Sequence, residues 1–422
     1  MQQQAGVCRF SYHWMILTIL FVGMMVSFGM RASFGAYITP WEYEFSVGRT
    51  TVTTISLLGF IIFAIGQPLA GKLNDHFGKN IVPTFGILVM GVCLILTSRA
   101  TQMWHVFAMF GVGFSIGIAA AGHNVSAAIL TQWFVEKRGM ALGLMTSGMA
   151  IGMLVLVPAN LFIIREVGWR TAMLVFGIII IATVGPLYLF LLKSKPEDKA
   201  MKPYGFAAAY ESAKSADHND DASKKEQKPL PVMGILKTKG FWFLAIPYFI
   251  CGVTDVGLIT THIIPMAEGR GIPDAIIALA VSLIAIANIA GTIGSGYLSD
   301  RFSRKRQLAF IYAFRAVTFV LLIFMQQHWL LLVFAVGYGA VEMASIAPTN
   351  SVAADLFRKY STGTVLGMVA LSHQLGGALG SWVPGIMYDI TGSYTNVLMV
   401  SVVLLLGMAF MSLGIPEESL QG

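Results

Sequence analysis

Long apolar runs, separated by short polar segments, fill almost the whole chain. A helix needs roughly 20 mostly apolar residues to cross a bilayer, and each run is about that long. In lipid a backbone must satisfy its own hydrogen bonds, which a helix does, and no run alternates as β-barrel strands would. The pattern predicts an all-α membrane protein with twelve transmembrane helices, or spans, near residues 14–37, 51–71, 81–98, 104–126, 140–163, 171–192, 241–265, 275–297, 308–326, 329–350, 364–386 and 394–414.

The composition agrees with a membrane protein. Of the 422 residues, 56% are hydrophobic and 12% charged, whereas a soluble domain has roughly 25% charged residues. The net charge of +7 does not indicate a nucleic-acid-binding protein, because the basic residues lie between apolar runs. The three cysteines, Cys8, Cys93 and Cys251, show neither a metal-ligand spacing nor a disulfide framework. The first run, from Trp14, has no early signal-peptide cleavage site.

Lysine and arginine predict the orientation. With the N-terminus inside, twenty-one of these residues fall in inner segments and five in outer ones, and Arg31 and Arg315 fall within spans. We therefore expect both termini in the cytoplasm and a multi-pass protein of the plasma or inner membrane. Arg315 is expected to anchor its span at the inner surface.

Residues 193–239 differ from the rest of the chain. The segment holds four prolines and a polar run from Ser215 to Lys228, a composition typical of a flexible linker. It separates residues 1–192 from residues 240–422, each with six predicted spans.

The two halves repeat each other. Gly71-Lys-Leu-Asn-Asp-His-Phe-Gly-Lys79 follows the second span and Gly296-Tyr-Leu-Ser-Asp-Arg-Phe-Ser-Arg304 follows the eighth, an offset of 225 residues. Pro40 and Pro265 show the same offset, and the glycine pairs that open spans 5 and 11 are offset by 224. An even number of spans separates equivalent positions, so the halves have the same orientation. The repeat predicts two pseudo-symmetric six-helix bundles.

These two loops resemble the Gly-xxx-Asp-Arg-x-Gly-Arg-Lys signature of the major facilitator superfamily. The first copy departs from it at His76 and Asn80, and the second at Ser303. The resemblance implies the major facilitator fold and transport by alternating access. It also implies a cytoplasmic latch that stabilises one conformation, although the same charges could only mark the inner face. The latch residues are Gly71, Asp75, Lys79, Gly296, Asp300, Arg301 and Arg304.

A narrower resemblance is to the monocarboxylate and oxalate–formate porter branch. It is carried by the segments 31–37, 133–139 and 389–394. The branch implies a small organic anion, moved with a proton or by exchange. It commonly has an arginine in span 8, where this chain has Asn288, and its oxalate-type members have a lysine in span 11, where this chain has His373.

In this fold, by resemblance, spans 1, 4, 7 and 10 line the central cavity, and they carry most of the intramembrane ionisable residues. Such groups usually face a cavity or a partner. Arg31 either recognises an anionic substrate or pairs with Asp255; a permanent ion pair and a side chain that reaches the outer surface are the alternatives. We predict substrate binding by Arg31, Tyr37, His262, Asn288 and His373, with His123 a further titratable candidate.

Asp255 and Glu342 are the candidates for proton coupling, because an apolar environment favours a carboxyl group that protonates reversibly. Carboxyl groups that only fix packing are the alternative. The glycines of spans 5 and 11 predict close helix packing.

The function predicted first is therefore secondary transport of a small organic anion, proton-coupled or by exchange. A proton-driven exporter of amphipathic compounds and a non-transporting membrane sensor are the alternatives. The sequence shows no ATP-binding loop, metal cluster or nucleophile motif, so we expect no enzyme, no cofactor and no metal. The expected partners are a small-molecule substrate, a proton or counter-substrate, and membrane lipid, with no nucleic acid, and the protein is expected to be a monomer.

Overall fold

The computed structural model describes residues 12–77, 80–193, 195–199, 201–205, 233–325, 327–357, 359–360 and 362–416. These residues are almost entirely helical. Outside the helices, one isolated β-bridge joins Phe134 to Tyr204 within this part of the chain. Most of the predicted linker, 206–232, lies outside the described residues.

The N-terminal bundle contains the first six spans. Its elements are α1 (Tyr12–Ala32), α2 (Gly35–Phe45), α3 (Arg49–Phe77), α4 (Ile81–Ser98), α5 (Met103–Val106), η1 (Phe107–Phe114), α6 (Ser115–Ala121), α7 (His123–Trp133), α8 (Arg138–Val167), α9 (Trp169–Ile179), η2 (Ile180–Val184) and η3 (Leu187–Leu191).

The C-terminal bundle contains the other six spans and follows the short elements η4 (Pro196–Lys199) and α11 (Met233–Leu236). Its elements are α12 (Lys239–Gly252), η5 (Val253–Ile259), α13 (Thr260–Glu268), α14 (Asp274–Arg301), α15 (Arg304–Ile323), α16 (His328–Glu342), α17 (Ile346–Leu356), α18 (Thr362–Thr391) and α19 (Thr395–Leu413).

Eleven helical segments among the described residues are long and apolar enough to cross a membrane. The remaining predicted span, the eleventh along the chain at 364–386, is α18, which is long enough but richer in small and polar residues. It packs against α3, α12 and η5. Elsewhere large apolar side chains point outward, for example Phe410, Val403 and Ile293 at 80%, 70% and 70% exposure, as expected for a surface in contact with lipid.

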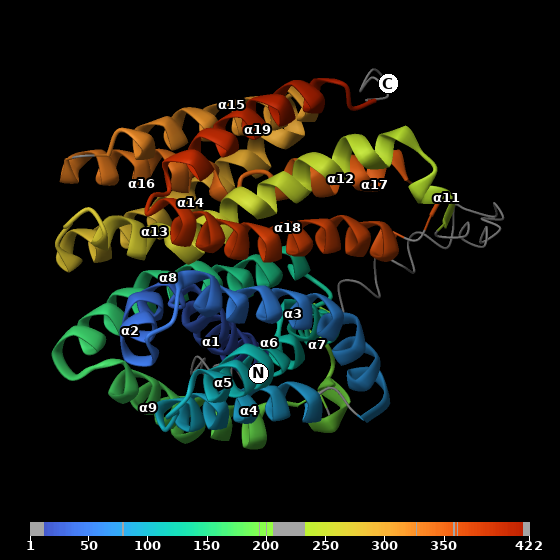
Figure 1. Cartoon of the computed structure of the whole chain (residues 1–422). Coiled ribbons are helices and arrows are strands. Elements are labelled where there is room, and N and C mark those ends of the chain that lie inside the picture. The colour runs from blue at the N-terminus through green and yellow to red at the C-terminus, as the bar shows by residue number, and fades with distance from the viewer. Residues whose placement is uncertain are drawn as a thin grey trace, which may run out of the picture.

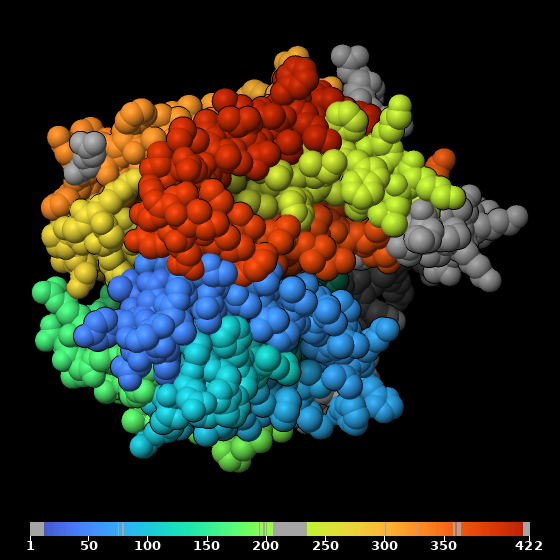
Figure 2. Space-filling view, in the orientation of Figure 1, coloured from blue at the N-terminus to red at the C-terminus, as the bar shows by residue number. Residues whose placement is uncertain are grey.

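The two bundles lie against each other, with the N-terminal bundle below in Figure 1. Their hydrophobic cores are largely separate: one is built from residues before the linker and the other mainly from residues after it. The bundles meet where α3 packs on α18 and α8 packs on α14. In Figure 2 the first of these contacts is visible where the blue surface touches the red one. The predicted fold of two six-helix bundles is confirmed.

Spans 1, 4, 7 and 10 are all interrupted. Span 1 breaks between α1 and α2, span 4 at Gly122, and span 10 between α16 and α17, while span 7 contains the π-helical segment η5. Arg31, His123 and Glu342 each lie beside a break, and Asp255 lies inside η5. Irregular backbone at membrane depth is tolerated where it lines a cavity, so these breaks mark the centre of the molecule as a candidate site.

The two ends of the molecule differ in how the bundles contact each other. We call the end where α3 ends and α8 begins the linker end, because linker residues pack there: Tyr204 bonds through its backbone to Trp133, Val135 and Glu136. The opposite end is called the far end. At the linker end a Cβ added to Gly71, Gly143 or Gly367 would meet no atom within 4 Å.

The far end is closed by two seams between the bundles. In the first, the Asp389 carboxylate at the end of α18 accepts hydrogen bonds from the backbone N–H groups of Arg49 and Thr50 at 2.9 and 2.8 Å. In the second, Arg165 near the end of α8 lies 3.6 Å from Asp274 at the start of α14. The structure is therefore closed at the far end.

Candidate functional site

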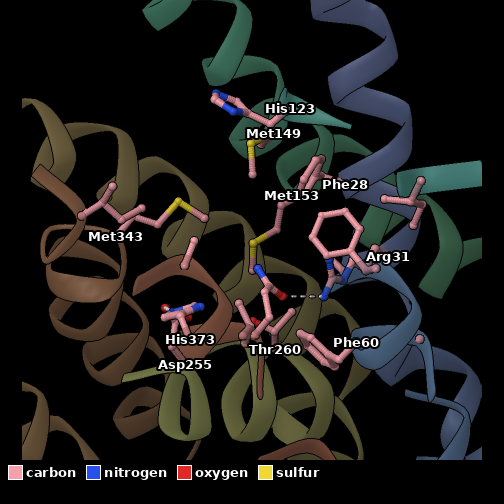
Figure 3. A pocket seen from close by; sticks show the side chains of 18 of the residues that line it. Phe28, Arg31, Phe60, His123, Met149, Met153, Asp255, Thr260, Met343 and His373 are labelled. Carbon is pink, nitrogen blue, oxygen red and sulfur yellow. Dashed lines mark hydrogen bonds and ion pairs between the residues drawn. The ribbon is translucent and has the colours of Figure 1, made fainter. Parts of the chain in front are cut away.

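A cavity of about 690 Å³ lies between the bundles. The N-terminal bundle contributes an aromatic and methionine-rich wall: Phe28, Phe34, Phe60, Phe63, Phe110, Phe114, Met149 and Met153. The C-terminal bundle contributes most of the polar lining, including Tyr248, Asp255, Asn288, Glu342, His373 and Gln374. The cavity is thus amphipathic, with the phenylalanines supplied by the N-terminal half and both acidic residues by the C-terminal half, while His123 of the N-terminal half and Met343 of the C-terminal half also line it (Figure 3).

Arg31 is the cation on the aromatic wall. Its guanidinium carbon lies 4.3 Å from the ring centre of Phe60 and 4.5 Å from that of Phe63. Its Nη2 donates to Gln374 Oε1 of the other bundle at 3.5 Å, the dashed line in Figure 3. No acidic side chain in the described part of the chain lies within ion-pair distance of Arg31. Arg31 is therefore held by aromatic rings and an amide, which leave its charge unbalanced.

Asp255 lies on the opposite side of the cavity (Figure 3). Its Oδ1 accepts a hydrogen bond from the Tyr338 hydroxyl at 3.1 Å, and its Oδ2 lies 3.9 Å from Nε2 of His373. The pairing of Asp255 with Arg31, one of the alternatives that the sequence left open, is absent from this structure. Asp255 has its own partners within the C-terminal bundle instead.

Glu342 is buried near Asp255 and belongs to the same polar group. Its Oε2 accepts from Asn288 Nδ2 at 2.6 Å. The structure therefore brings together four of the predicted site residues, Asp255, Asn288, Glu342 and His373, in one network on the polar wall.

Arg315 corrects a prediction. It does not anchor α15 at the surface but is fully buried. It donates to Cys251 Sγ at 3.0 Å and to the carbonyl oxygens of Val341 and Glu342 at 2.8 and 2.6 Å. Those carbonyls are free to accept because α16 ends at Glu342. Hydropathy could not reveal this, since it does not show which way a side chain points or that a broken helix lies beside it.

Tyr37 and His262 lie outside the cavity lining. Tyr37 is fully buried and its hydroxyl bonds Asn160 Oδ1. His262 is also fully buried: Nδ1 lies 2.9 Å from the Tyr394 hydroxyl and Nε2 lies 2.8 Å from the Ser381 carbonyl oxygen. The polar atoms of both side chains are hydrogen-bonded within the protein. The structure therefore does not place these residues with the other candidate substrate-binding residues.

The His262 contact belongs to a chain of hydrogen bonds at the far end. Arg49 forms a two-pronged ion pair with Glu42 at 2.6 and 2.7 Å and donates to the Tyr394 hydroxyl at 3.0 Å. With that hydroxyl accepting from Arg49, its own proton is available for His262 Nδ1. This chain links the N-terminal bundle to the C-terminal bundle beside the Asp389 seam.

The structure describes only part of the predicted latch. Gly71 and Gly296 have open space beside them, because a Cβ at either position would meet nothing within 4 Å. Arg304 pairs with Asp355, and Arg301 lies over the Tyr297 ring at 4.2 Å. Lys79 is outside the described residues, and the side chains of Asp75 and Asp300 are outside the described part.

Sequence reasoning missed three residues of this site. Gln374 and Tyr338 bond the two central ionisable groups, and Phe60 shields Arg31. Gln374 is a polar residue within a predicted span and directly follows the candidate His373, so the sequence did offer a signal for it. Tyr338 and Phe60 resemble ordinary apolar span residues in sequence, so no signal distinguished them.

Comparisons with known proteins agree with this architecture. The Major Facilitator Superfamily model matches residues 19–313 and 246–421. Monocarboxylate transporter 13 of Rattus norvegicus is 24% identical over 388 residues, covering 90% of this chain and 84% of that protein. The uncharacterized MFS-type transporter YcxA of Bacillus subtilis (strain 168) is 24% identical over 405 residues, covering 92% of each. Monocarboxylate transporter 12 of Rattus norvegicus is 23% identical over 399 residues, covering 90% of this chain and 81% of that protein.

A solved structure has the same fold. It is a bacterial homologue of the human lysosomal transporter Spinster, in an inward-facing and unoccupied conformation. The two share a TM-score of 0.72 at 15% sequence identity, over 97% of this chain and 98% of that one. Since the family model spans nearly the whole chain and the two-bundle fold agrees with it, this chain belongs to the Major Facilitator Superfamily and is a membrane transporter rather than an enzyme.

Proposed function

We propose that this protein moves a small organic anion across the membrane together with a proton. The observation that carries the proposal is the unbalanced charge of Arg31 on the cavity wall. A charge at membrane depth is costly unless it finds a partner. A carboxylate is the partner that a guanidinium binds best, through two parallel hydrogen bonds. The names of relatives that are monocarboxylate transporters support an anionic substrate.

The polar wall supports coupling to a proton. Asp255 and Glu342 line the same wall at membrane depth, with His373 Nε2 3.9 Å from the Asp255 carboxylate. Ionisable groups held together in this way inside a membrane protein form proton relays in transporters. On the opposite wall Arg31 has no acidic partner within ion-pair distance among the described residues, so a monocarboxylate that binds it neutralises a charge that is otherwise costly at this depth.

Alternating access supplies the movement. The far end is closed by the Asp389 and Arg165 seams, and the linker end has open space around its glycines. The positive-inside rule favours a cytoplasmic linker end. This structure then corresponds to a carrier open to the cytoplasm, and the opposite state forms when the bundles rock so that the far end opens and the latch glycines approach each other.

The cavity also favours a second candidate. The phenylalanine wall suits an amphipathic compound, as expected of a proton-driven exporter. An exporter of neutral or cationic amphipathic compounds would not depend on Arg31. Dependence on Arg31 therefore separates the two functions.

The test is a thermal-stability screen of the purified protein against a panel of monocarboxylates, then uptake of the stabilising acid into proteoliposomes. An inward proton gradient is expected to raise accumulation of the acid. Arg31→Gln is expected to weaken binding about 10- to 100-fold, the loss of one charge-assisted pair, with Arg31→Lys restoring part of it.

Arg99→Gln is the matched control, since this arginine is exposed just after α4 and does not line the cavity. It is expected to bind the acid like the wild type. Unchanged binding and uptake by Arg31→Gln would show that this residue does not recognise the substrate. Uptake that does not change with the proton gradient, but requires the same acid inside the proteoliposomes, would indicate exchange instead of symport.

A further inference from the structure

We infer that the substrate is an aromatic monocarboxylate, whose carboxylate binds Arg31 and whose ring lies against the phenylalanine wall. This inference rests on the proposed function and narrows it from organic anions in general to one chemical class. It comes from the shape and lining of the cavity, which a very small anion would not use.

The first argument is the position of Arg31 within the aromatic wall. Two phenylalanine rings cover the guanidinium, and Phe28 lies near it in Figure 3. Further along the wall, Phe34 stacks on Phe110 and Phe110 stacks on Phe114, with ring centres 6.0 and 4.7 Å apart. An anion bound to Arg31 must therefore place the rest of its body beside aromatic rings. Ring-against-ring contacts add to the apolar burial that such a body gains.

The second argument is size. Pockets of roughly 300–1,000 Å³ suit ligands with many non-hydrogen atoms, and this cavity measures about 690 Å³. An anion of two or three carbons would fill only the space beside Arg31. Most of the aromatic wall would then stay in contact with water, so little of the available hydrophobic stabilisation would be gained.

The third argument concerns charge. A second carboxylate on the far side of the ring would reach the wall that carries Asp255 and Glu342. Like charges close together at low dielectric repel strongly. Neutral polar groups such as hydroxyls can instead meet Asn288 and His373 on that wall. The cavity therefore favours one carboxylate over two and tolerates an uncharged polar group opposite it.

Four probes separate these contributions in binding measurements on the purified full-length protein. Phenylacetate has both features, acetate lacks the ring, phenylacetamide lacks the charge, and 4-carboxyphenylacetate carries a second carboxylate across the ring. Phenylacetate is expected to bind about 10- to 100-fold more tightly than acetate, the ratio that follows from burying a phenyl ring. The amide and the dicarboxylate are each expected to bind about tenfold or more weakly than phenylacetate.

Phe28→Leu keeps an apolar side chain but removes one ring of the wall. It is expected to weaken phenylacetate binding severalfold and leave acetate binding unchanged. Phe162→Leu is the matched control, because Phe162 is 66% exposed on the outer face of α8. It is expected to leave the binding of both acids unchanged.

The possible failures are distinguishable. Equal affinity for acetate and phenylacetate, both lost in Arg31→Gln, would overturn the aromatic class and leave the anion transporter standing. Tight binding of phenylacetamide that is unchanged in Arg31→Gln would overturn the proposal of an anion transporter itself. Preference for the dicarboxylate would overturn the single-charge argument, and failure of all four probes to bind would overturn the inference as a whole.

Discussion

Arg31 and Asp255 occupy nearly corresponding positions in the two bundles, nine residues before Pro40 and ten before Pro265. Their surroundings differ. Arg31 lies among phenylalanine rings with an amide as its polar partner, whereas Asp255 belongs to a network with a tyrosine, a histidine and a second carboxyl group. The repeat preserved the helices and their breaks, but it did not preserve the chemistry placed on them.

This difference indicates a division of roles. The N-terminal bundle supplies a cation and an apolar wall, which suit an amphipathic anion. The C-terminal bundle supplies groups that can hold and release a proton. Because both sets face one cavity from opposite bundles, a rocking movement of the bundles changes their separation. Substrate and proton sites can thereby influence each other without overlapping.

The largest expected effect comes from removing the proton-holding group of the C-terminal bundle. Asp255→Asn is expected to lower accumulation driven by a proton gradient at least about tenfold, because the remaining network has one carboxyl group fewer. Exchange of internal for external substrate should persist, since Arg31 is untouched. Both rates are measured in proteoliposomes. Glu166→Gln, a neutralised exposed carboxylate near the end of α8 that does not line the cavity, should accumulate substrate normally. Normal accumulation by Asp255→Asn would refute the division of roles.

The next prediction tests whether close helix packing contributes equally to the stability of the two bundles. A Cβ on Gly152 would lie 2.1 Å from the Met25 carbonyl oxygen, and one on Gly376 would lie 2.0 Å from that of Phe249. Gly152→Ala and Gly376→Ala are each expected to destabilise the protein by about 1–3 kcal/mol, the usual cost of overpacking. Thermal unfolding in detergent measures the change.

The controls for this prediction lie on the same helices. A Cβ added to Gly143 of α8 or to Gly367 of α18 would have open space around it. Replacing either by alanine should be neutral or slightly stabilising, because alanine favours a helix over glycine by about 1 kcal/mol. Similar effects at all four positions would mean that the close contacts do not limit stability in either bundle.

The smallest effects are expected at the far-end seams, which are related by the repeat but carry opposite charges. Arg165 and Asp389 are offset by 224 residues, and Arg49 and Asp274 by 225. Asp389 accepts two backbone N–H groups at the start of α3 as well as the Thr50 hydroxyl. The Arg165–Asp274 pair is longer, and its side chains are 63% and 39% exposed.

Asp389→Ala should therefore lower the free energy that favours the closed far end by about 1–2 kcal/mol, as for a lost helix cap. Asp274→Ala should lower it by less than about 1 kcal/mol, as for an exposed ion pair. Labelling of Ser56→Cys from the far side, in a protein without its native cysteines, reports opening. Asp389→Ala should raise the labelling rate about 5- to 30-fold. Equal rates in the two variants would show that the two seams contribute equally to closure.

Much of the fold was predictable from local patterns. Spans and the repeat follow from hydropathy and from spaced glycines and prolines, because lipid restricts a spanning chain to helices. The site was predictable only in part. Asp255, Glu342, Asn288 and His373 were identified from their polarity within spans and do share one network. Tyr37 and His262 were identified on the same grounds but are buried away from the cavity.

The prediction for Arg315 failed for a related reason. A hydropathy pattern places a residue along the membrane normal but does not give its direction around the helix axis. Arg315 points inward to carbonyls that became available because α16 ends at Glu342. A break between two helices is a property of the folded bundle, and its position was not evident from the residues around it.

The sequence by itself determined that the chain spans a membrane, that it consists of two parallel halves, and that it carries charges where only a cavity or a partner could hold them. Tertiary structure decided which charges face the cavity, which partners they have and which end of the molecule is closed. The reason is physical. Burial in lipid depends on each residue's own polarity, whereas pairing depends on distances between helices that are far apart in the chain, such as the approach of Gln374 to Arg31.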